Sequence, residues 1–202
     1  MKAVILISGN GSNLQSIIEN ADRIDLQISC VISNNKNAFG LKRAQSSKIQ
    51  TCVIEAELFN SREAFDSQLI NIINKYGVEL IILAGYMRIL TPLFVEHYFG
   101  KIINIHPSLL PKFPGLNSHQ KAIDDAEKTH GASVHFVTKE LDSGPIIIQE
   151  IVSIENEDTV ATLSDKVLKV EHVIYPKVIH WYTQKRLKLI NNSTITLDGK
   201  II

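Results

Sequence analysis

The chain has 202 residues, which is enough for one domain with a full hydrophobic core. Hydrophobic residues make up 45% and charged residues 21%, as in an ordinary globular protein. Lys plus Arg and Asp plus Glu both number 21, so no global positive field exists to attract nucleic acid. No apolar run approaches the ~18 residues that a membrane-spanning helix requires, so we expect no membrane partner.

Strands and helices are expected to alternate over the first half of the chain. The expected strands are apolar runs bounded by turn residues: Ala3–Ser8, Leu26–Ser33, Thr51–Ile54, Val78–Ala84 and Lys101–His106. Helical spacing follows at four places: after Gly9-Asn10-Gly11, near Ala38, after Asn60 as an expected N-cap, and from Thr91-Pro92. This alternation predicts an α/β fold with a doubly wound, mostly parallel, Rossmann-like sheet.

The pattern changes after Pro107. We expect a helix over Ser118–Lys128, two longer strands as antiparallel additions to the sheet, a long helix that Pro176 kinks, and a small C-terminal hairpin. The two strands are Ala132–Val137 and Ile146–Ile154, and the long helix is 159–180. No linker separates these segments, so we expect a single domain over residues 1–202.

The glycine-rich turn between the first strand and the first helix is a candidate anion site. Gly9-Asn10-Gly11 lets the backbone approach a phosphate, and Ser12-Asn13 supply donors at the positive end of the helix. The turn alone is weak evidence for a phosphate site, because a tight turn that merely connects a strand to a helix needs the same glycines. A dinucleotide site is disfavoured, since Leu14 replaces the third glycine and Ser33-Asn34 stand where an acidic residue would hold a ribose.

Polar residues end the fifth expected strand. Side chains alternate along a strand, so Asn104 and His106 share one face while Ile103 and Ile105 take the other. Polar side chains at the carboxyl end of a buried strand are costly unless partnered, and that end is where open α/β sheets bind ligands. Pro107 holds His106 extended. The alternative is a structural Asn and His that satisfy the following turn.

Asp142 lies in the expected loop between the two late strands. It could orient a nearby histidine and stabilise its positive charge, although an isolated Asp in a turn is more often a turn former. The remaining histidines suggest less: His97 and His180 are expected on helix surfaces, His130 at a helix end, His135 in a strand, and His119 near a site. No pair has a recognised metal spacing, so we expect no metal. Cys30 and Cys52 are read as reduced core thiols of a cytoplasmic protein.

Taken together, these motifs resemble the folate-dependent formyltransferases. INIHPSLLP with a downstream LDSGP loop is specific for the family at large, and the segments SGNGSNL and EHVIYP narrow the resemblance to the branch that formylates glycinamide ribonucleotide. The resemblance covers nearly the whole chain. It implies a phosphate-binding half at about residues 1–100 and a folate-binding and catalytic half at about 101–202.

The resemblance also implies a role for each matching residue. Asn104, His106 and Asp142 would be catalytic. The ribonucleotide would be bound by Gly11, Ser12, Asn13, Pro107 and Glu171. The folate would be bound by Arg62, Met87, Arg88, Ile89, Leu90, Asn104, Thr138, Lys139, Glu140, Leu141 and Asp142. The implied formyl donor is 10-formyltetrahydrofolate, with no metal, and the protein would be a monomer or a homodimer.

The sequence departs from the family pattern at two places: Ser143 stands where a second glycine is expected, and Asn117-Ser118 stand where His-Thr is familiar. Three alternatives carry different expectations. A methionyl-tRNA formyltransferase would need a further RNA-binding domain after His180, and a formyltetrahydrofolate deformylase would usually carry a regulatory domain before Ala3. A non-enzymatic nucleotide-binding module would not need Asn104 and His106.

Overall fold

A computed structural model describes all 202 residues, which form two compact units. The first unit is Met1–Asn104 and the second is Ile105–Ile202. The boundary falls inside strand β5 (Ile102–His106), so this strand carries the chain from one unit into the other.

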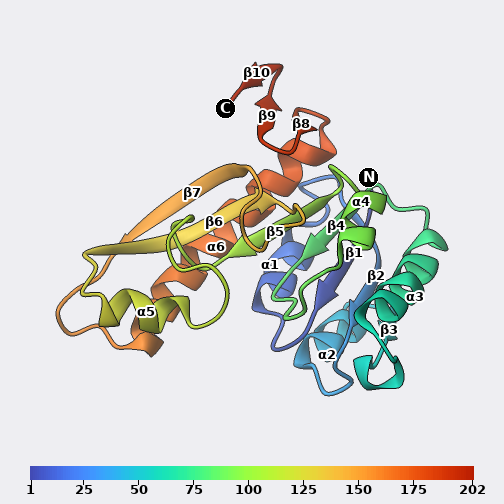
Figure 1. Cartoon of the computed structure of the whole chain (residues 1–202), viewed down its shortest axis with the longest axis horizontal. Coiled ribbons are helices and arrows are strands. Elements are labelled where there is room, and N and C mark those ends of the chain that lie inside the picture. Colours follow the sequence, from blue (N-terminus) through green and yellow to red (C-terminus); the bar gives the residue numbers. More distant parts are fainter. The chain divides into compact units, whose positions relative to one another are not determined.

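A parallel sheet forms the centre of the first unit. Its strands follow the order β3-β2-β1-β4-β5, with parallel pairing at every step (Figure 1). They are β1 (Lys2–Ile7), β2 (Gln27–Ser33), β3 (Thr51–Val53), β4 (Leu80–Leu83) and β5 (Ile102–His106). Every residue of β4 is buried, as expected for a strand covered on both faces.

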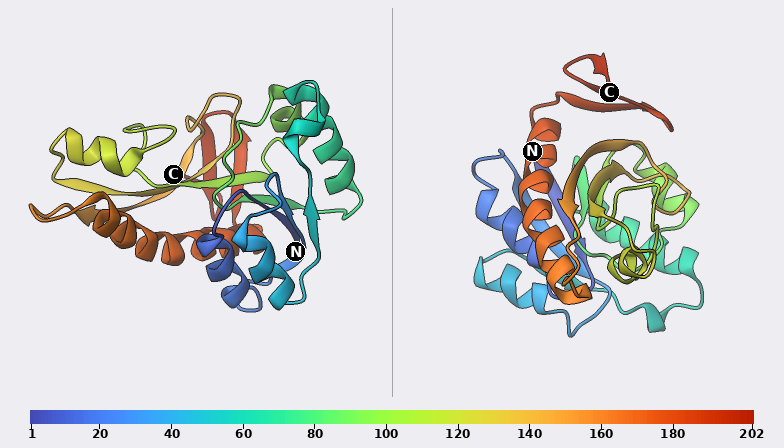
Figure 2. Two further views of the ribbon diagram at one scale, coloured as in Figure 1. Left: turned by 90° about the horizontal axis from the view of Figure 1, so that it is seen from below. Right: turned by 90° about the vertical axis from the view of Figure 1, so that its left-hand side faces the viewer.

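Helices cover both faces of this sheet. They are α1 (Ser12–Asn20), α2 (Phe39–Ser46), α3 (Arg62–Asn74) and α4 (Pro92–His97), with a short 3₁₀ turn at Ala56–Leu58. In Figure 2, α1 and α2 lie on one side of the strands and α3 and α4 on the other, which is the doubly wound arrangement that the sequence predicts. The predicted cap of α3 is wrong by one residue: Ser61, not Asn60, accepts the hydrogen bond from the Ala64 amide.

The second unit combines an antiparallel strand pair with a long helix and a small sheet. Its elements are α5 (Ser118–Asp124), β6 (Thr129–Phe136), β7 (Ile146–Ser153), α6 (Val160–Thr183), β8 (Leu187–Asn191), β9 (Thr194–Leu197) and β10 (Lys200–Ile201). Helix α6 packs along β6 and β7, and the last three strands pair antiparallel in the order β10-β9-β8. The expected C-terminal hairpin therefore carries a third strand.

Strand β6 begins earlier than the sequence predicts. It starts at Thr129, and α5 ends at Asp124 rather than at Lys128. Gly131 explains the difference, because a Cβ there would lie 2.0 Å from the Glu150 carbonyl oxygen of β7. Gly131 therefore marks a close approach of two strands. It does not mark the end of a helix.

The expected fold class is confirmed. The protein is an α/β protein with a mostly parallel sheet, antiparallel strands in its second half and a small C-terminal antiparallel sheet. Helix α6 continues past Pro176 to Thr183. None of the helices combines the length and the apolar character needed to cross a membrane.

Candidate active site

The glycine-rich turn of the first unit joins β1 to α1 with backbone that only glycine adopts easily. Gly11 has a φ of +74° and a left-handed conformation, and α1 begins at Ser12 without a side-chain cap. Gly9 and Asn10 are exposed, and a Cβ on Gly9 would meet nothing within 4 Å. The turn leads directly into the amino end of α1, where the helix dipole favours an anion. The turn therefore offers open space beside the positive end of a helix.

The segment after β4 is tied down through its backbone. The Met87 amide donates to the Ser8 hydroxyl at 2.7 Å, and Ser8 donates in turn to the Asn34 side-chain oxygen at 2.5 Å. At the other end, the Thr91 amide donates to the buried Asp66 carboxylate at 2.6 Å. These bonds fix the backbone of 87–90 between two anchors.

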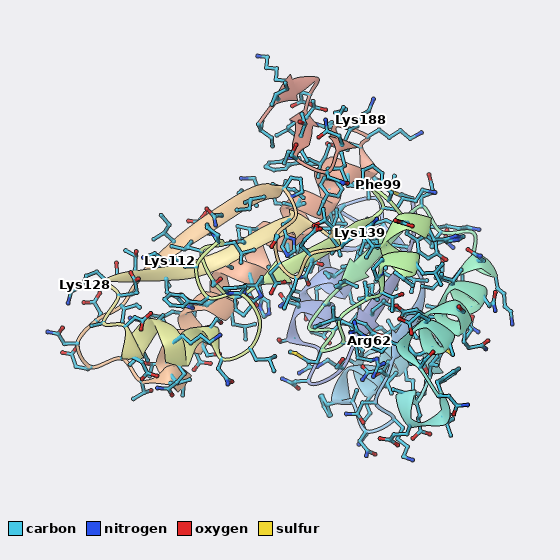
Figure 3. The ribbon with its side chains drawn as sticks, in the orientation of Figure 1. Arg62, Phe99, Lys112, Lys128, Lys139 and Lys188 are labelled. Atoms are coloured by element: carbon cyan, nitrogen blue, oxygen red, sulfur yellow. The ribbon has the colours of Figure 1, made fainter.

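The side chains of this segment form an exposed apolar surface beside two arginines. Met87 and Ile89 are 67% and 51% exposed, whereas Leu90 is buried. Arg62, at the start of α3 (Figure 3), donates to the Ile89 carbonyl at 2.6 Å. The Arg88 guanidinium lies 4.3 Å from the centre of the Phe65 ring. The structure thus brings together the residues of 62–90 that the family resemblance assigns to folate.

In the second unit the structure brings His106 to Asp142. The His106 Nδ1 atom lies 3.4 Å from the Asp142 Oδ2 atom, and the two side chains are only 8% and 9% exposed. Asp142 has a φ of +49°, a left-handed conformation that Asp tolerates better than most residues. A buried carboxylate therefore faces the histidine that ends β5.

The loop 113–115 contacts both members of this pair. The His106 Nε2 atom lies 2.9 Å from the Phe113 carbonyl oxygen, and the Gly115 amide donates to Asp142 Oδ2 at 2.9 Å. A carbonyl and a carboxylate can only accept, so His106 satisfies both neighbours only with a proton on each ring nitrogen.

The neighbouring histidines are arranged to stay neutral. His119 Nδ1 lies 3.1 Å from His130 Nε2, so one ring donates and the other accepts. Burial, and then the nearby His119, lowers the pKa of His130 to about 4. Burial also lowers the pKa of His119 and of His135, whose Nε2 atom lies 3.8 Å from Asp142 Oδ1. His135 also has an acceptor at each ring nitrogen, since its Nδ1 atom lies 2.8 Å from the Phe136 carbonyl oxygen, but its contact with Asp142 is longer than that of His106.

The loop between β6 and β7 is shaped by a close backbone contact. A Cβ on Gly144 would lie 1.8 Å from the Phe136 carbonyl oxygen, so only glycine fits. Lys139 (Figure 3), Glu140 and Leu141 are exposed. The Thr138 hydroxyl is buried and has no hydrogen-bond partner in the protein.

The other expected residues lie on regular elements. Asn104 precedes His106 by two residues on β5, so the two side chains share a face, and Pro107 follows the strand. Glu171 is buried on α6. No group of three His, Cys, Asp or Glu side chains is placed to hold a metal ion.

Three features of the site escape the sequence analysis. The prediction that His130 ends a helix is wrong, since this residue is buried inside β6. The contacts of Phe113 and Gly115 with the His–Asp pair use backbone atoms, which leave no side-chain signal. The Pro-Gly pair at 114–115 is the only hint that the backbone turns there.

Comparisons with known proteins show the family of the chain. The sequence model of the formyl transferase family matches residues 1–179. The phosphoribosylglycinamide formyltransferase of Escherichia coli is 48% identical over 202 residues, covering 99% of this chain and 95% of that protein. The enzyme of the same name from Haemophilus influenzae is 44% identical over 203 residues, covering 100% of this chain and 95% of that protein.

A solved structure of a similar protein has the same fold as this chain. The phosphoribosylglycinamide formyltransferase of Coxiella burnetii, solved in complex with CHES, superposes with a TM-score of 0.96 at 49% identity, covering 100% of this chain and 95% of that one. The chain belongs to the formyl transferase family.

Proposed function

We propose that the protein transfers the formyl group of 10-formyltetrahydrofolate to the amine of N1-(5-phosphoribosyl)glycinamide, as an enzyme of de novo purine biosynthesis. The products are the N2-formyl ribonucleotide and tetrahydrofolate. The observation that carries the proposal is the buried His106–Asp142 pair at the end of β5, in a chain whose full-length relatives are named for this reaction.

The ribonucleotide is assigned to residues that offer donors and one carboxylate. Gly11, Ser12 and Asn13 hold the phosphate at the amino end of α1, where backbone amides and the helix dipole favour an anion. Pro107 contacts the ribonucleotide, and Glu171 hydrogen-bonds its amine. The exposure of Gly9 and Asn10 supports this assignment, because a ligand can reach the turn.

The folate is assigned to two segments with apolar side chains and accessible polar groups. In the first unit, Arg62 and residues 87–90 supply a cation and the exposed surface of Met87 and Ile89. In the second unit, residues 138–142 supply backbone groups and the unpartnered Thr138 hydroxyl. An aromatic cofactor with carboxylates and ring amides fits this set of donors.

The mechanism needs no covalent enzyme intermediate and no metal. The acceptor amine attacks the formyl carbon, and negative charge develops on the formyl oxygen. Asn104 and the imidazolium of His106 donate hydrogen bonds to that oxygen, an effect worth ~3 kcal/mol per donor. Asp142 holds His106 in its charged form and aligns a water molecule. This water carries the proton lost by the amine to the folate nitrogen, whose bond to the formyl carbon breaks.

The proposal also concerns partners and location. The substrates are small molecules, with no nucleic acid or membrane partner, and the protein acts in the cytoplasm as a monomer or a homodimer. The equal numbers of acidic and basic residues and the free thiols of Cys30 and Cys52 support this reading.

The test is formyl transfer from a labelled donor. Purified protein is incubated with formyl-labelled 10-formyltetrahydrofolate, with and without the ribonucleotide, and the label is followed into formyl ribonucleotide and into free formate. We expect label in the ribonucleotide and release of tetrahydrofolate only when the acceptor is present, with His106→Ala as the inactive control. Equal release of formate with and without acceptor would instead identify a hydrolase, and formylation of methionyl-tRNA would identify the RNA-directed branch.

A further inference from the structure

Helix α2 braces the glycine-rich turn of the first unit through Arg43. The Arg43 Nε atom donates to the Asn10 carbonyl at 2.9 Å, and one of its terminal nitrogens lies 3.4 Å from the Asn10 side-chain oxygen. The other terminal nitrogen reaches the Gln15 side-chain oxygen on α1 at 3.5 Å. Its guanidinium lies 4.9 Å from the centre of the Phe39 ring. One side chain thus connects α2 to the turn and to the helix that follows it.

The backbone of α2 reinforces this brace. The Gly40 amide donates to the Gly9 carbonyl at 3.1 Å. A Cβ on Gly11 would lie 2.7 Å from the Gly40 Cα atom, and a Cβ on Gly40 would lie 2.5 Å from the Ile7 Cδ1 atom. Gly11 must be a glycine for this approach, because its Cβ would meet backbone, whereas at Gly40 the Ile7 side chain would have to shift. The turn thus rests directly on the first turn of α2.

These contacts determine where the amides of the turn point. In a planar trans peptide, the carbonyl of one residue and the amide of the next point in opposite directions. The Gly9 and Asn10 carbonyls point to Gly40 and Arg43. The amides of Asn10 and Gly11 therefore point away from α2, to the open side of the turn. The Arg43 contact thus helps to fix the orientation of the Asn10–Gly11 peptide.

We infer that Arg43 is a positioning residue for phosphate binding. It holds the Asn10–Gly11 peptide so that its amide faces the phosphate, and its own charge adds attraction for an anion beside the turn. Half-buried and held by three hydrogen-bonding groups, Arg43 is already ordered before the ligand arrives. This inference rests on the proposed function, because it takes the phosphate of the ribonucleotide as the occupant of the turn.

The test separates positioning from charge. Arg43→Ala removes both, Arg43→Lys keeps the charge but cannot reproduce the forked contact, and Lys42→Ala is the matched control. Lys42 is exposed on the same helix, 6.0 Å from the same Phe39 ring, so its removal changes the net charge equally. We expect Arg43→Ala to raise the KM for the ribonucleotide and the inhibition constant of inorganic phosphate by roughly tenfold each. The kcat and the KM for 10-formyltetrahydrofolate should stay unchanged.

The variants give clear outcomes. Arg43→Lys should show a smaller rise than Arg43→Ala, Lys42→Ala should show none, and the dephosphorylated riboside should react equally well with all four proteins. An equal rise for Lys42→Ala and Arg43→Ala, or equal KM values for wild type and Arg43→Ala, would overturn the inference. Wild-type protein that transfers no formyl group to the ribonucleotide would overturn the proposed function instead.

Discussion

Replacement of Asp142 by Asn removes one negative charge with little change in shape, and we expect it to lower kcat by at least about 100-fold. Asn accepts the left-handed conformation that Asp142 adopts at φ +49°, and its amide oxygen can still accept from the Gly115 amide. The fold should therefore be retained.

The magnitude follows from the distance and the burial of the pair. The His106 Nδ1 and Asp142 Oδ2 atoms are 3.4 Å apart, and both side chains are less than one-tenth exposed. Opposite unit charges near 4 Å interact by about 4 kcal/mol at an effective dielectric constant of about 20. In the proposed mechanism, a His106 side chain without this partner donates a weaker hydrogen bond to the formyl oxygen in the transition state, where one such donor is worth ~3 kcal/mol. A loss of about 2.7 kcal/mol corresponds to the 100-fold decrease.

The assay is steady-state formyl transfer with both substrates saturating, together with thermal unfolding. Asp198→Asn is the matched control, because Asp198 is also left-handed, at φ +54°, and also paired with a cation, Arg186, but its side chain is 52% exposed. His106→Ala should lose at least as much activity as Asp142→Asn, and the double variant little more than His106→Ala alone, as for groups that act as a unit. Near wild-type kcat in Asp142→Asn with intact folding would refute the assigned role.

Three further predictions concern binding and pH. Gly11→Val should weaken ribonucleotide binding and spare folate binding, since its Cβ would meet the Gly40 backbone at 2.7 Å; calorimetry that shows equal losses for both ligands would contradict this. Glu171→Gln should raise the KM for the ribonucleotide roughly tenfold and leave that for 10-formyltetrahydrofolate unchanged, and an unchanged ribonucleotide KM would remove Glu171 from the site. Burial lowers the pKa of His130 from 6.5 to about 4, so between these values the unfolded chain binds a proton that the folded protein does not. The free energy of unfolding should therefore fall by up to about 3 kcal/mol as the pH drops through this window, and urea titrations of His130→Gln that kept the full decrease would contradict the assignment.

The sequence predicts those parts of the fold that depend on local pattern. Apolar runs such as β4 read as buried strands, and Thr91 with Pro92 marks the start of α4, where the Thr91 side chain caps the helix. The alternation of side chains along a strand is enough to place Asn104 and His106 on one face of β5. The prediction that β5 and the LDSGP loop form one site comes from the family motifs and not from residue spacing.

Contacts between distant segments escape the local pattern. Nothing in the residues near His106 indicates that Asp142 lies 3.4 Å away, because the contact depends on the pairing of β6 with β7 and on the loop between them. His130 shows the same limit: a histidine before a glycine resembles a helix end, but the glycine serves the approach of β7. In each case tertiary packing overrides the local signal.

The loop after Asp142 shows how the structure decides which departures from a family pattern matter. Ser143 stands where the family pattern has a glycine, but its side chain is exposed and its hydroxyl donates to the Leu141 carbonyl at 2.9 Å. Gly144, by contrast, lies against the Phe136 carbonyl, where a Cβ would come within 1.8 Å. This contact returns the chain to β7 and helps to hold Asp142 opposite His106. The geometry of the His106–Asp142 pair therefore depends on the glycine at 144 and tolerates the serine at 143.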